Sequence, residues 1–173
     1  GLVGSEMCIR DRTHLRLKQA EDLLKQGLAE AQRLARMGSW IWDIPQNTLD
    51  WSDEMYRICG RDRQQFDVTR EAFLAVVHPE DRILVRQAMN QTFSTHAPYH
   101  LEYRLLLSDG QERIVHEQTE IILNEAGVPR RMLGTIQDIT ERRQLESEIK
   151  KLSMIIEESI NFVFITDADG AIE

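Results

Sequence analysis

The feature that most constrains the fold is a change of hydrophobic period after Pro98. From there on, large apolar side chains fall at every second position, which is the period of a β-strand with one buried face. Two turn signals interrupt the pattern, Asp109-Gly110 and residues 124–127, and both are typical of hairpins. The sequence therefore predicts three consecutive antiparallel strands up to Asp138. The residues expected on the buried face of the first strand are Tyr99, Leu101, Tyr103, Leu105 and Leu107.

Two further strands are expected ahead of this region. Trp40, Trp42 and Ile44 alternate with other residues and predict a strand with an aromatic face. A turn at residues 45–48 leads to a short second strand that ends at Trp51. With helices between the two groups of strands, this order predicts an α+β fold in which a five-stranded antiparallel sheet carries helices on one face.

Three helices are expected between the two groups of strands. The first begins at Ser52, a residue type that caps helices, and the second spans residues 69–77. The third is expected to start at His78-Pro79, because proline fits the first position of a helix and the two acidic residues after it suit the positive end. A stripe at four-residue spacing is expected to bury this helix: Val85, Met89 and Phe93.

Coiled-coil-like helices are expected on both sides of this domain. Within residues 13–37, Leu17, Leu24 and Ala31 lie seven positions apart, and Gly38 is expected to end the helix. Beyond residue 140 apolar residues follow a spacing of four, three and four positions, at Leu145, Ile149, Leu152 and Ile156. A lone helix of this length is marginal in water, so we expect the seam to pair with a second copy in a parallel homodimer.

The last strand passes into the helix after it without a glycine or proline. Asp138 or Thr140 is expected to accept hydrogen bonds from the first amides of the helix. Glu141 lies three residues after Asp138, the spacing of a capping box. We therefore expect Asp138, Thr140 and Glu141 to relay a movement of the strand into the helix.

The composition excludes several classes of partner. With 21 Lys and Arg residues against 29 Asp and Glu residues, the formal charge is −8, which disfavours sequence-independent binding to nucleic acid or anionic lipid. The longest apolar runs, such as residues 72–77, are far shorter than the roughly 20 residues of a membrane helix. The two cysteines form neither a metal-binding pattern nor a disulfide framework. We expect a cytoplasmic location, in a parent protein that is either free or membrane-anchored.

These motifs together make the chain resemble a PAS sensor domain of the Trp-rich group found in bacterial signalling proteins. The resemblance covers about residues 37–145. The segments that carry it are residues 38–43, residues 51–60, residues 78–82, Tyr103-Arg104 before Asp109-Gly110, and residues 134–143, which contain Asp138-Ile-Thr140.

The resemblance implies a division of the chain. Residues 38–140 would form the PAS domain and residues 141–160 a signalling helix, while residues 161–173 resemble the start of a second PAS domain. Residues 1–12 have no periodicity and are expected to be artefactual or disordered. Family members usually precede an output module, most often a histidine kinase and next a diguanylate cyclase. This piece is therefore expected to be a sensory and dimerisation module without catalysis of its own.

The resemblance also implies a site for a small molecule or partner between the sheet and the helices. The pocket candidates are Trp40, Trp42, Tyr56, Met89 and Tyr103. Core packing explains the same aromatic residues, and Ile114 stands where many of these domains have a tryptophan. The sequence requires no cofactor and identifies none. A ligand-free scaffold that only dimerises and spaces other domains is the alternative.

Other chemical interpretations of single residues have simpler structural explanations. The histidines at 78, 96, 100 and 116 raise the question of haem or a metal, but His78 is explained by a helix start, and His100 and His116 by solvent-facing or cross-strand positions. Cys59 lacks the Asn-Cys-Arg-Phe-Leu pattern of flavin-binding relatives. The acidic residues 50–54 fit a helix start better than a pair of catalytic carboxylates. The sequence therefore predicts no metal site and no catalytic residues.

Overall fold

The computed structural model describes the backbone of residues 2–160 and the side chains of residues 14–157. Its strands are β1 (Met37–Asp43), β2 (Thr48–Trp51), β3 (His100–Leu106), β4 (Glu112–Leu123) and β5 (Pro129–Asp138). Its helices are α1 (Leu2–Leu34), α2 (Asp53–Ile58), α3 (Arg70–Val76), α4 (Arg82–Thr95) and α5 (Thr140–Ile160). The chain divides into two compact units, one that ends at Asp138 and one that starts at Ile139. Residues 161–173, expected to begin a second domain, lie outside the described residues.

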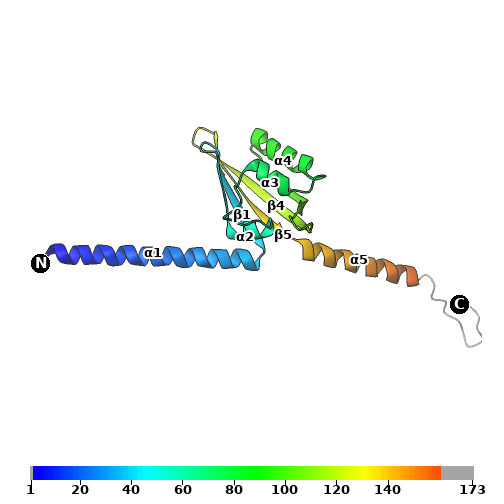
Figure 1. Ribbon diagram of the computed structural model, residues 1–173, viewed down its shortest axis with the longest axis horizontal. Coiled ribbons are helices and arrows are strands. Elements are labelled where there is room, and N and C mark those ends of the chain that lie inside the picture. Colours follow the sequence, from blue (N-terminus) through cyan, green and yellow to red (C-terminus); the bar gives the residue numbers. More distant parts are fainter. Residues whose placement is uncertain (1, 161–173) are drawn as a thin grey trace, which may run out of the picture. The chain divides into compact units, whose positions relative to one another are not determined.

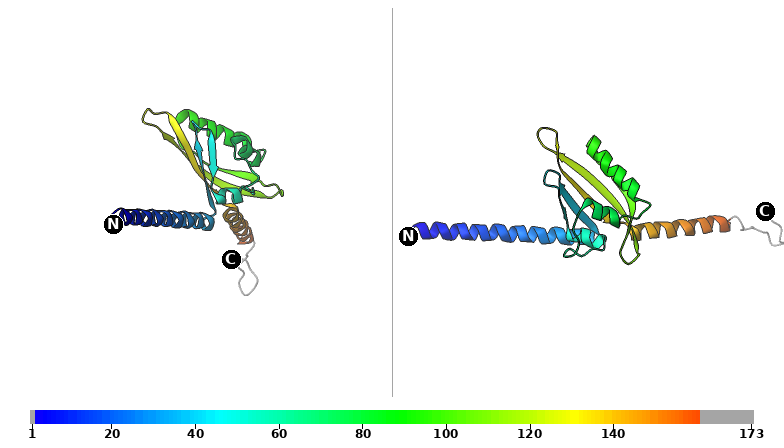
Figure 2. Two further views of the ribbon diagram at one scale, coloured as in Figure 1. Left: turned by 60° about the vertical axis from the view of Figure 1, so that its left-hand side comes forward. Right: turned by 45° about the horizontal axis from the view of Figure 1, so that its top comes forward.

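The five strands form one antiparallel sheet in the order β2-β1-β5-β4-β3. Helices α3 and α4 lie over one face of this sheet (Figures 1 and 2). The arrangement confirms the predicted α+β fold. Its register places Trp40 of β1 opposite Trp51 of β2 on one side and opposite Gly134 of β5 on the other.

The core lies between the sheet and the helices. As the period of two predicted, Tyr103 and Leu105 on β3 are buried, and Val115 on β4 and Ile136 on β5 share their face. Helix α4 contributes Met89, together with Val85, from the predicted stripe. Ser52 caps α2 by accepting a hydrogen bond from the amide of Met55, also as expected. The alternation of apolar residues is thus sufficient to specify which face of each strand is buried.

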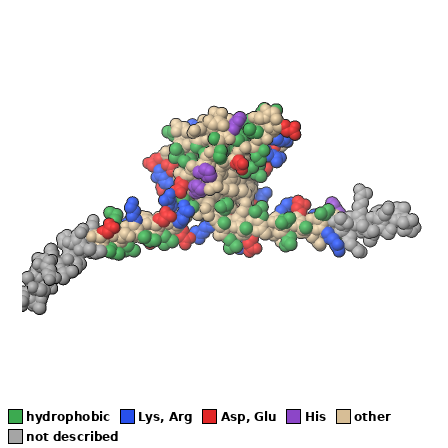
Figure 3. Space-filling view, turned by 180° about the vertical axis from the view of Figure 1, so that it is seen from behind, with side chains coloured by type: hydrophobic (Ala, Val, Ile, Leu, Met, Phe, Trp, Pro, Cys, Tyr) green, Lys and Arg blue, Asp and Glu red, His purple; other side chains and the backbone are tan. Residues whose placement is uncertain are grey.

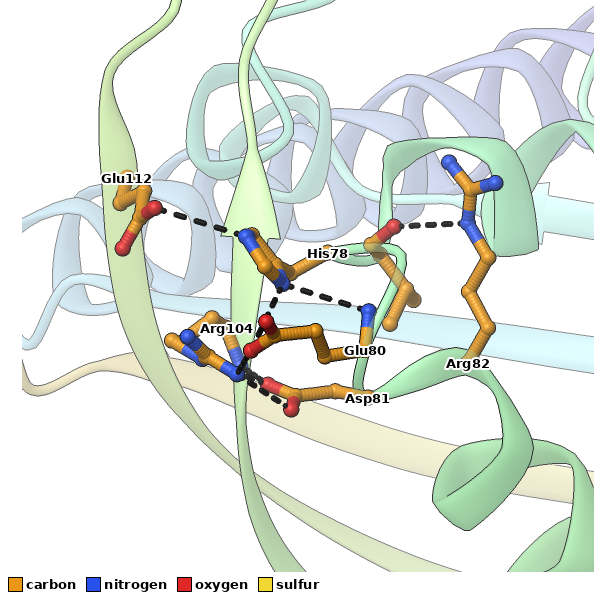
Figure 4. Close-up of polar contacts among 7 residues, drawn as sticks. His78, Glu80, Asp81, Arg82, Arg104 and Glu112 are labelled. Atoms are coloured by element: carbon orange, nitrogen blue, oxygen red, sulfur yellow. Dashed lines mark hydrogen bonds and ion pairs between the residues drawn. The ribbon is translucent and has the colours of Figure 1, made fainter.

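The start of α4 differs from the expectation. The helix begins at Arg82, and Pro79 lies in the turn before it. Asp81 makes no side-chain capping bond; its Oδ1 and Oδ2 accept hydrogen bonds from the guanidinium of Arg104 on β3 at 2.8 and 3.0 Å (Figure 4). Glu80 accepts a further bond from Arg104 at 2.7 Å. Glu80 and Asp81 therefore bind the segment before α4 to strand β3 of the sheet.

His78 adds to this connection. Its backbone amide donates to the carbonyl of Arg104 at 2.8 Å, and its Nε2 lies 3.5 Å from Oε1 of Glu112 on β4 (Figure 4). Arg82 donates from Nε to the carbonyl of Val77 at 3.0 Å. These contacts explain why two motifs far apart in the sequence, residues 78–82 and the Tyr103-Arg104 pair, occur together.

Helix α1 also differs from the expectation at both ends. It begins at Leu2, so the backbone of residues 2–12, expected to be disordered or artefactual, is helical; a helical backbone does not test the origin of these residues. It ends at Leu34, where Arg36 takes a left-handed conformation with φ of 49°. Gly38, expected to end the helix, lies in β1. The helix end is therefore formed by Arg36.

Gly38 is required by a close approach between β1 and α2. A Cβ atom at this position would lie 2.6 Å from Cα and 2.8 Å from N of Met55. Replacing Gly38 with alanine should lower the free energy of unfolding by about 1–3 kcal/mol, the usual effect of overpacking. Gly27→Ala is the matched control, because nothing lies within 4 Å of a Cβ there and alanine favours helix. Urea unfolding checks both; equal stability of Gly38→Ala and the wild type would contradict the packing argument.

Candidate functional site

A small cavity lies in the core beside the aromatic face of β1. Strand alternation directs Trp40 and Trp42 inward from β1 and Trp51 inward from β2. The cavity has a volume of about 20 Å³, which is room for about one water molecule. Its lining residues are Trp40, Trp42, Leu49, Trp51, Met55, Arg70, Phe73, Met89 and Glu117.

The aromatic walls of the cavity already have partners within the protein. The Trp51 ring stacks on Phe66 at 5.3 Å between centroids and meets Tyr56 edge-on at 5.3 Å. Trp42 meets Phe93 edge-on at 5.0 Å. Such pairs stabilise a core by about 0.5–1.5 kcal/mol each beyond their burial, so packing holds these walls in place.

Glu117 on β4 is a buried carboxylate at the wall of the cavity. It accepts hydrogen bonds from Nε1 of Trp40 at 3.0 Å, from the hydroxyl of Tyr99 at 2.8 Å and from the hydroxyl of Tyr103 at 3.0 Å. The Trp40 bond crosses a strand, since β5 lies between β1 and β4. This is possible because Gly134 on β5 has no side chain: a Cβ there would lie 2.7 Å from the Trp40 ring.

Burial controls the acid–base behaviour of this cluster. Loss of water raises the pKa of Glu117 to about 7, although the hydrogen bonds from Tyr99, Tyr103 and Trp40 act in the opposite direction. Burial, together with the neighbouring Glu117 carboxylate, also raises the pKa of Tyr99 and of Tyr103. The two tyrosines therefore remain proton donors, and Glu117 is the group that changes charge near neutral pH.

The structure brings together some of the predicted pocket residues. Trp40, Trp42 and Met89 line the cavity, while Tyr103 donates a hydrogen bond to Glu117 and Tyr56 packs edge-on against Trp51. Trp51, an aromatic residue at the end of a predicted strand, lines the cavity too, and sequence reasoning missed the other lining residues: Leu49, Met55, Arg70, Phe73 and Glu117. The alternation of the strand could have identified Glu117 as a buried residue. It occupies an inward position between Val115 and Thr119, both of which are buried.

The end of β5 is tied to the start of the domain. The amide of Asp138 donates to the carbonyl of Arg36 at 3.0 Å, and Nε2 of Gln137 donates to the carbonyl of Ala35 at 3.2 Å. The Asp138 carboxylate lies 3.8 Å from Nε of Arg113, and Nη1 of Arg113 donates to the carbonyl of Ile58 at the end of α2. The residues that lead out of α1 are thus held against the end of the last strand.

The predicted relay residues fall at the junction of strand and helix. Strand β5 ends at Asp138 and helix α5 begins at Thr140, followed by Glu141 in its first turn. The capping-box interaction proposed for them stays a prediction. Hydrophobic side chains line the surfaces of α1 and α5 (Figure 3). On α5 the predicted seam residues are all exposed: Leu145, Ile149, Leu152 and Ile156.

The histidines considered for metal binding and the cysteine considered for flavin chemistry lie in different parts of the domain. His100 and His116 stack with ring centroids 6.3 Å apart, and no group of three His, Cys, Asp or Glu residues among the described side chains is placed to hold a metal ion. Cys59 is buried, and burial raises the pKa of its thiol to about 12. In the part of the chain that the structure describes, no helix combines the length and the apolar character of a membrane span.

Comparison with known families identifies this arrangement. The sequence profile of the family described as PAS fold matches residues 48–136. The chain belongs to the PAS family. The aromatic cavity between sheet and helices is therefore the interior of a PAS domain.

Relatives of this PAS domain include several signalling proteins. The chain is 27% identical over 137 residues to a probable diguanylate cyclase, DgcE, of Escherichia coli K12, covering 78% of this chain and 12% of that protein. It is 24% identical over 141 residues to the sensor protein FixL of Bradyrhizobium diazoefficiens, covering 79% of this chain and 28% of that protein. The chain thus spans less than a third of the length of either relative.

Solved structures resemble the same region. A sensory box histidine kinase/response regulator from Burkholderia thailandensis E264 has 25% identity and a TM-score of 0.58, covering 74% of this chain and 95% of that one. A domain of a putative light and redox sensing histidine kinase from Haloarcula marismortui has 26% identity and a TM-score of 0.53. The match covers 66% of this chain and 99% of that one. The relatives of this PAS domain therefore include sensor histidine kinases.

Proposed function

We propose that residues 38–140 form a sensory and dimerisation module of a larger cytoplasmic signalling receptor, and that helix α5 relays its state to an output domain. A histidine kinase is the first proposal for that output and a diguanylate cyclase the second, because both kinds of protein are among the relatives and solved structures that the chain resembles. In this proposal the described region contributes no catalytic residue. It binds a small molecule or a partner and biases one of two arrangements of the sheet.

One observation carries the proposal: the strand that supports the cavity leads directly into the exit helix. Strand β5 provides Gly134 beneath the Trp40 ring, it ends at Asp138, and α5 begins at Thr140. With no glycine or proline in between, a shift of β5 is expected to move α5 rather than to be absorbed by a loop. Coupling of this kind is typically about 1–3 kcal/mol.

The exposed apolar seam of α5 supports a second copy of this chain as the partner. Its spacing of four, three and four positions is that of a coiled coil, and Arg142 and Glu146, 3.5 Å apart, lie beside it. A helix with such a stripe gains stability by burying it against an identical stripe.

Replacing Ile149 with aspartate should weaken the dimer by about 100-fold or more. Each chain of the dimer would lose one isoleucine side chain from the seam, and burial of each of the two contributes about 1.5–3 kcal/mol. Ser147→Asp is the control, because it places the same charge on an exposed position outside the seam. Sedimentation equilibrium measures both dissociation constants. A wild-type chain that is monomeric at all accessible concentrations, or an unchanged constant for Ile149→Asp, would refute the proposed dimer.

A ligand-free scaffold is the second candidate, and the cavity volume favours it. About 20 Å³ is too little for a metabolite unless the walls move, and those walls are already packed against protein groups. A thermal-shift screen with metabolites, flavins and haem distinguishes the two candidates. A ligand that raises the melting temperature in a saturable way supports the sensor, whereas no stabilising compound supports the scaffold.

A further inference from the structure

The side chain of Arg70 lines both the aromatic cavity and a second space. This space is a hollow of about 200 Å³ lined by Trp42, Asn47, Leu49, Val68, Thr69, Arg70 and Glu71. Trp42, Leu49 and Arg70 line both the hollow and the cavity. The guanidinium of Arg70 lies over the Trp42 ring, 5.4 Å from its centroid. Arg70 and Trp42 therefore lie in the wall that the two spaces share, and we call this pair the gate.

Arg70 has a hydrogen-bonding capacity that the protein does not use. Its Nε is buried and has no hydrogen-bond partner among the described residues. A buried donor without an acceptor is destabilising, so an acceptor that reaches this donor from the hollow would remove that cost. A carboxylate is the acceptor that suits a guanidinium best, because its two oxygens match the planar fork.

Two other groups of the hollow can donate to an anion. Oδ1 of Asn47 accepts a hydrogen bond from Nε1 of Trp42 at 3.3 Å, which fixes the orientation of the amide and leaves its NH₂ group as a donor. Thr69 accepts from the amide of Ala72 at 3.0 Å and keeps its hydroxyl proton for another partner. Both residues line the same hollow as Arg70.

The charges around the gate limit the ligand to a single negative charge. Among the residues that the structure describes, Arg70 is the only cation that lines either space, whereas Glu71 lines the hollow and Glu117 lines the cavity. A multiply charged anion would meet both carboxylates. A monocarboxylate can place its charge at Arg70, away from Glu117, and direct an uncharged body between the tryptophan rings.

We propose that this gate binds a small monocarboxylate with a flat, apolar body. This inference rests on the proposed sensory function and names the class of ligand for the same cavity. The carboxylate pairs with Arg70 and draws it off the Trp42 ring, and the body takes the place of the guanidinium against the aromatic walls. The two spaces then join into one pocket. Stacking on tryptophan selects a planar body.

Tryptophan fluorescence tests the proposal, because all three tryptophans of the chain line the cavity. Benzoate and phenylacetate serve as probes, and benzamide is the neutral control with the same ring. We expect a saturable change with at least one carboxylate, and at least tenfold weaker binding of benzamide. Absence of a saturable change with both carboxylates, or equal affinity for benzoate and benzamide, would overturn the proposal.

Variants of two arginines sharpen the test. Arg70→Met should weaken carboxylate binding at least tenfold, and circular dichroism verifies that the variant is folded. Arg61→Met is the matched control: the Arg61 guanidinium lies 5.3 Å from the Phe66 ring and its Nε is likewise buried without a partner among the described residues, but it lines neither space. Its affinity should equal that of the wild type. Wild-type affinity of a folded Arg70→Met would overturn the assignment.

The result of the carboxylate-binding test can be distinguished from the result that tests the proposed function. Dimerisation through α5 is measured by sedimentation without any ligand, so failure of the carboxylate proposal leaves that result unaffected. A carboxylate that binds through Arg70 to a chain that does not dimerise would support the ligand class and contradict the proposed dimer.

Discussion

Replacing Glu117 with leucine should lower the free energy of unfolding by about 3 kcal/mol at neutral pH. The substitution removes the acceptor shared by Trp40, Tyr99 and Tyr103, and all three donors would then lack their partner in the core. A buried donor left unpaired costs about 1–3 kcal/mol, while removal of a desolvated carboxylate and burial of an apolar side chain offset part of the loss.

A matched substitution on the same strand separates this effect from a general effect of leucine. Glu120→Leu changes an exposed position of β4 and should alter stability by less than about 0.5 kcal/mol. Urea unfolding monitored by tryptophan fluorescence compares the two variants. If Glu117→Leu were as stable as Glu120→Leu, the buried cluster would have no structural role and the site would need another explanation.

The stability of the domain should fall as pH rises through neutrality. Burial raises the pKa of Glu117 to about 7 in the folded chain, above the ordinary value of 4.5. The folded state therefore holds a proton that the unfolded state releases, so the contribution of this group is fully present below about pH 4.5 and is lost as pH rises through 7. The difference corresponds to about 3 kcal/mol between pH 4 and pH 8.

Other titratable groups affect the free energy of unfolding in a different pH range, or contribute equally to the wild type and to the Glu117→Gln variant. Arg104 holds the pKa values of Glu80 and Asp81 below their usual range, so their contribution is lost only in acid. Glu117→Gln keeps an acceptor oxygen and does not titrate, so the wild type minus this variant isolates Glu117. Unfolding free energies at pH 4, 6 and 8 give the difference. A difference that is constant across this range would contradict the raised pKa.

Much of the fold could be predicted from the sequence because the buried face of each strand repeats every two residues. The alternation placed Tyr103 and Leu105 correctly, and Ser52 indicated the start of α2. The predicted start of α4 was wrong because Glu80 and Asp81 bind Arg104, which lies on a strand far along the sequence. A local pattern records helix preference but not a tertiary ion pair.

The candidate site was less accessible to sequence reasoning for a similar reason. The aromatic residues Trp40 and Trp42 were recognised as pocket candidates, but Glu117 was not, since its donors come from β1 and from the β3 side of the sheet. Arg70 gave no signal, because in the sequence an arginine at a helix start is ordinary. Its importance depends on a ring and a hollow formed by distant segments.

The central claim is that β5 and α5 move together, and a distance between spin labels tests it most directly. With Cys8 replaced by serine and buried Cys59 kept, labels are placed at Gln118 on β4 and Gln144 on α5, and labelled chains are diluted with unlabelled ones. Pulsed electron paramagnetic resonance should give a narrow distance distribution, which broadens when Asp138 and Thr140 are both replaced by alanine. A broad distribution in the otherwise unmodified chain would mean that the helix moves independently of the strand, which contradicts the relay.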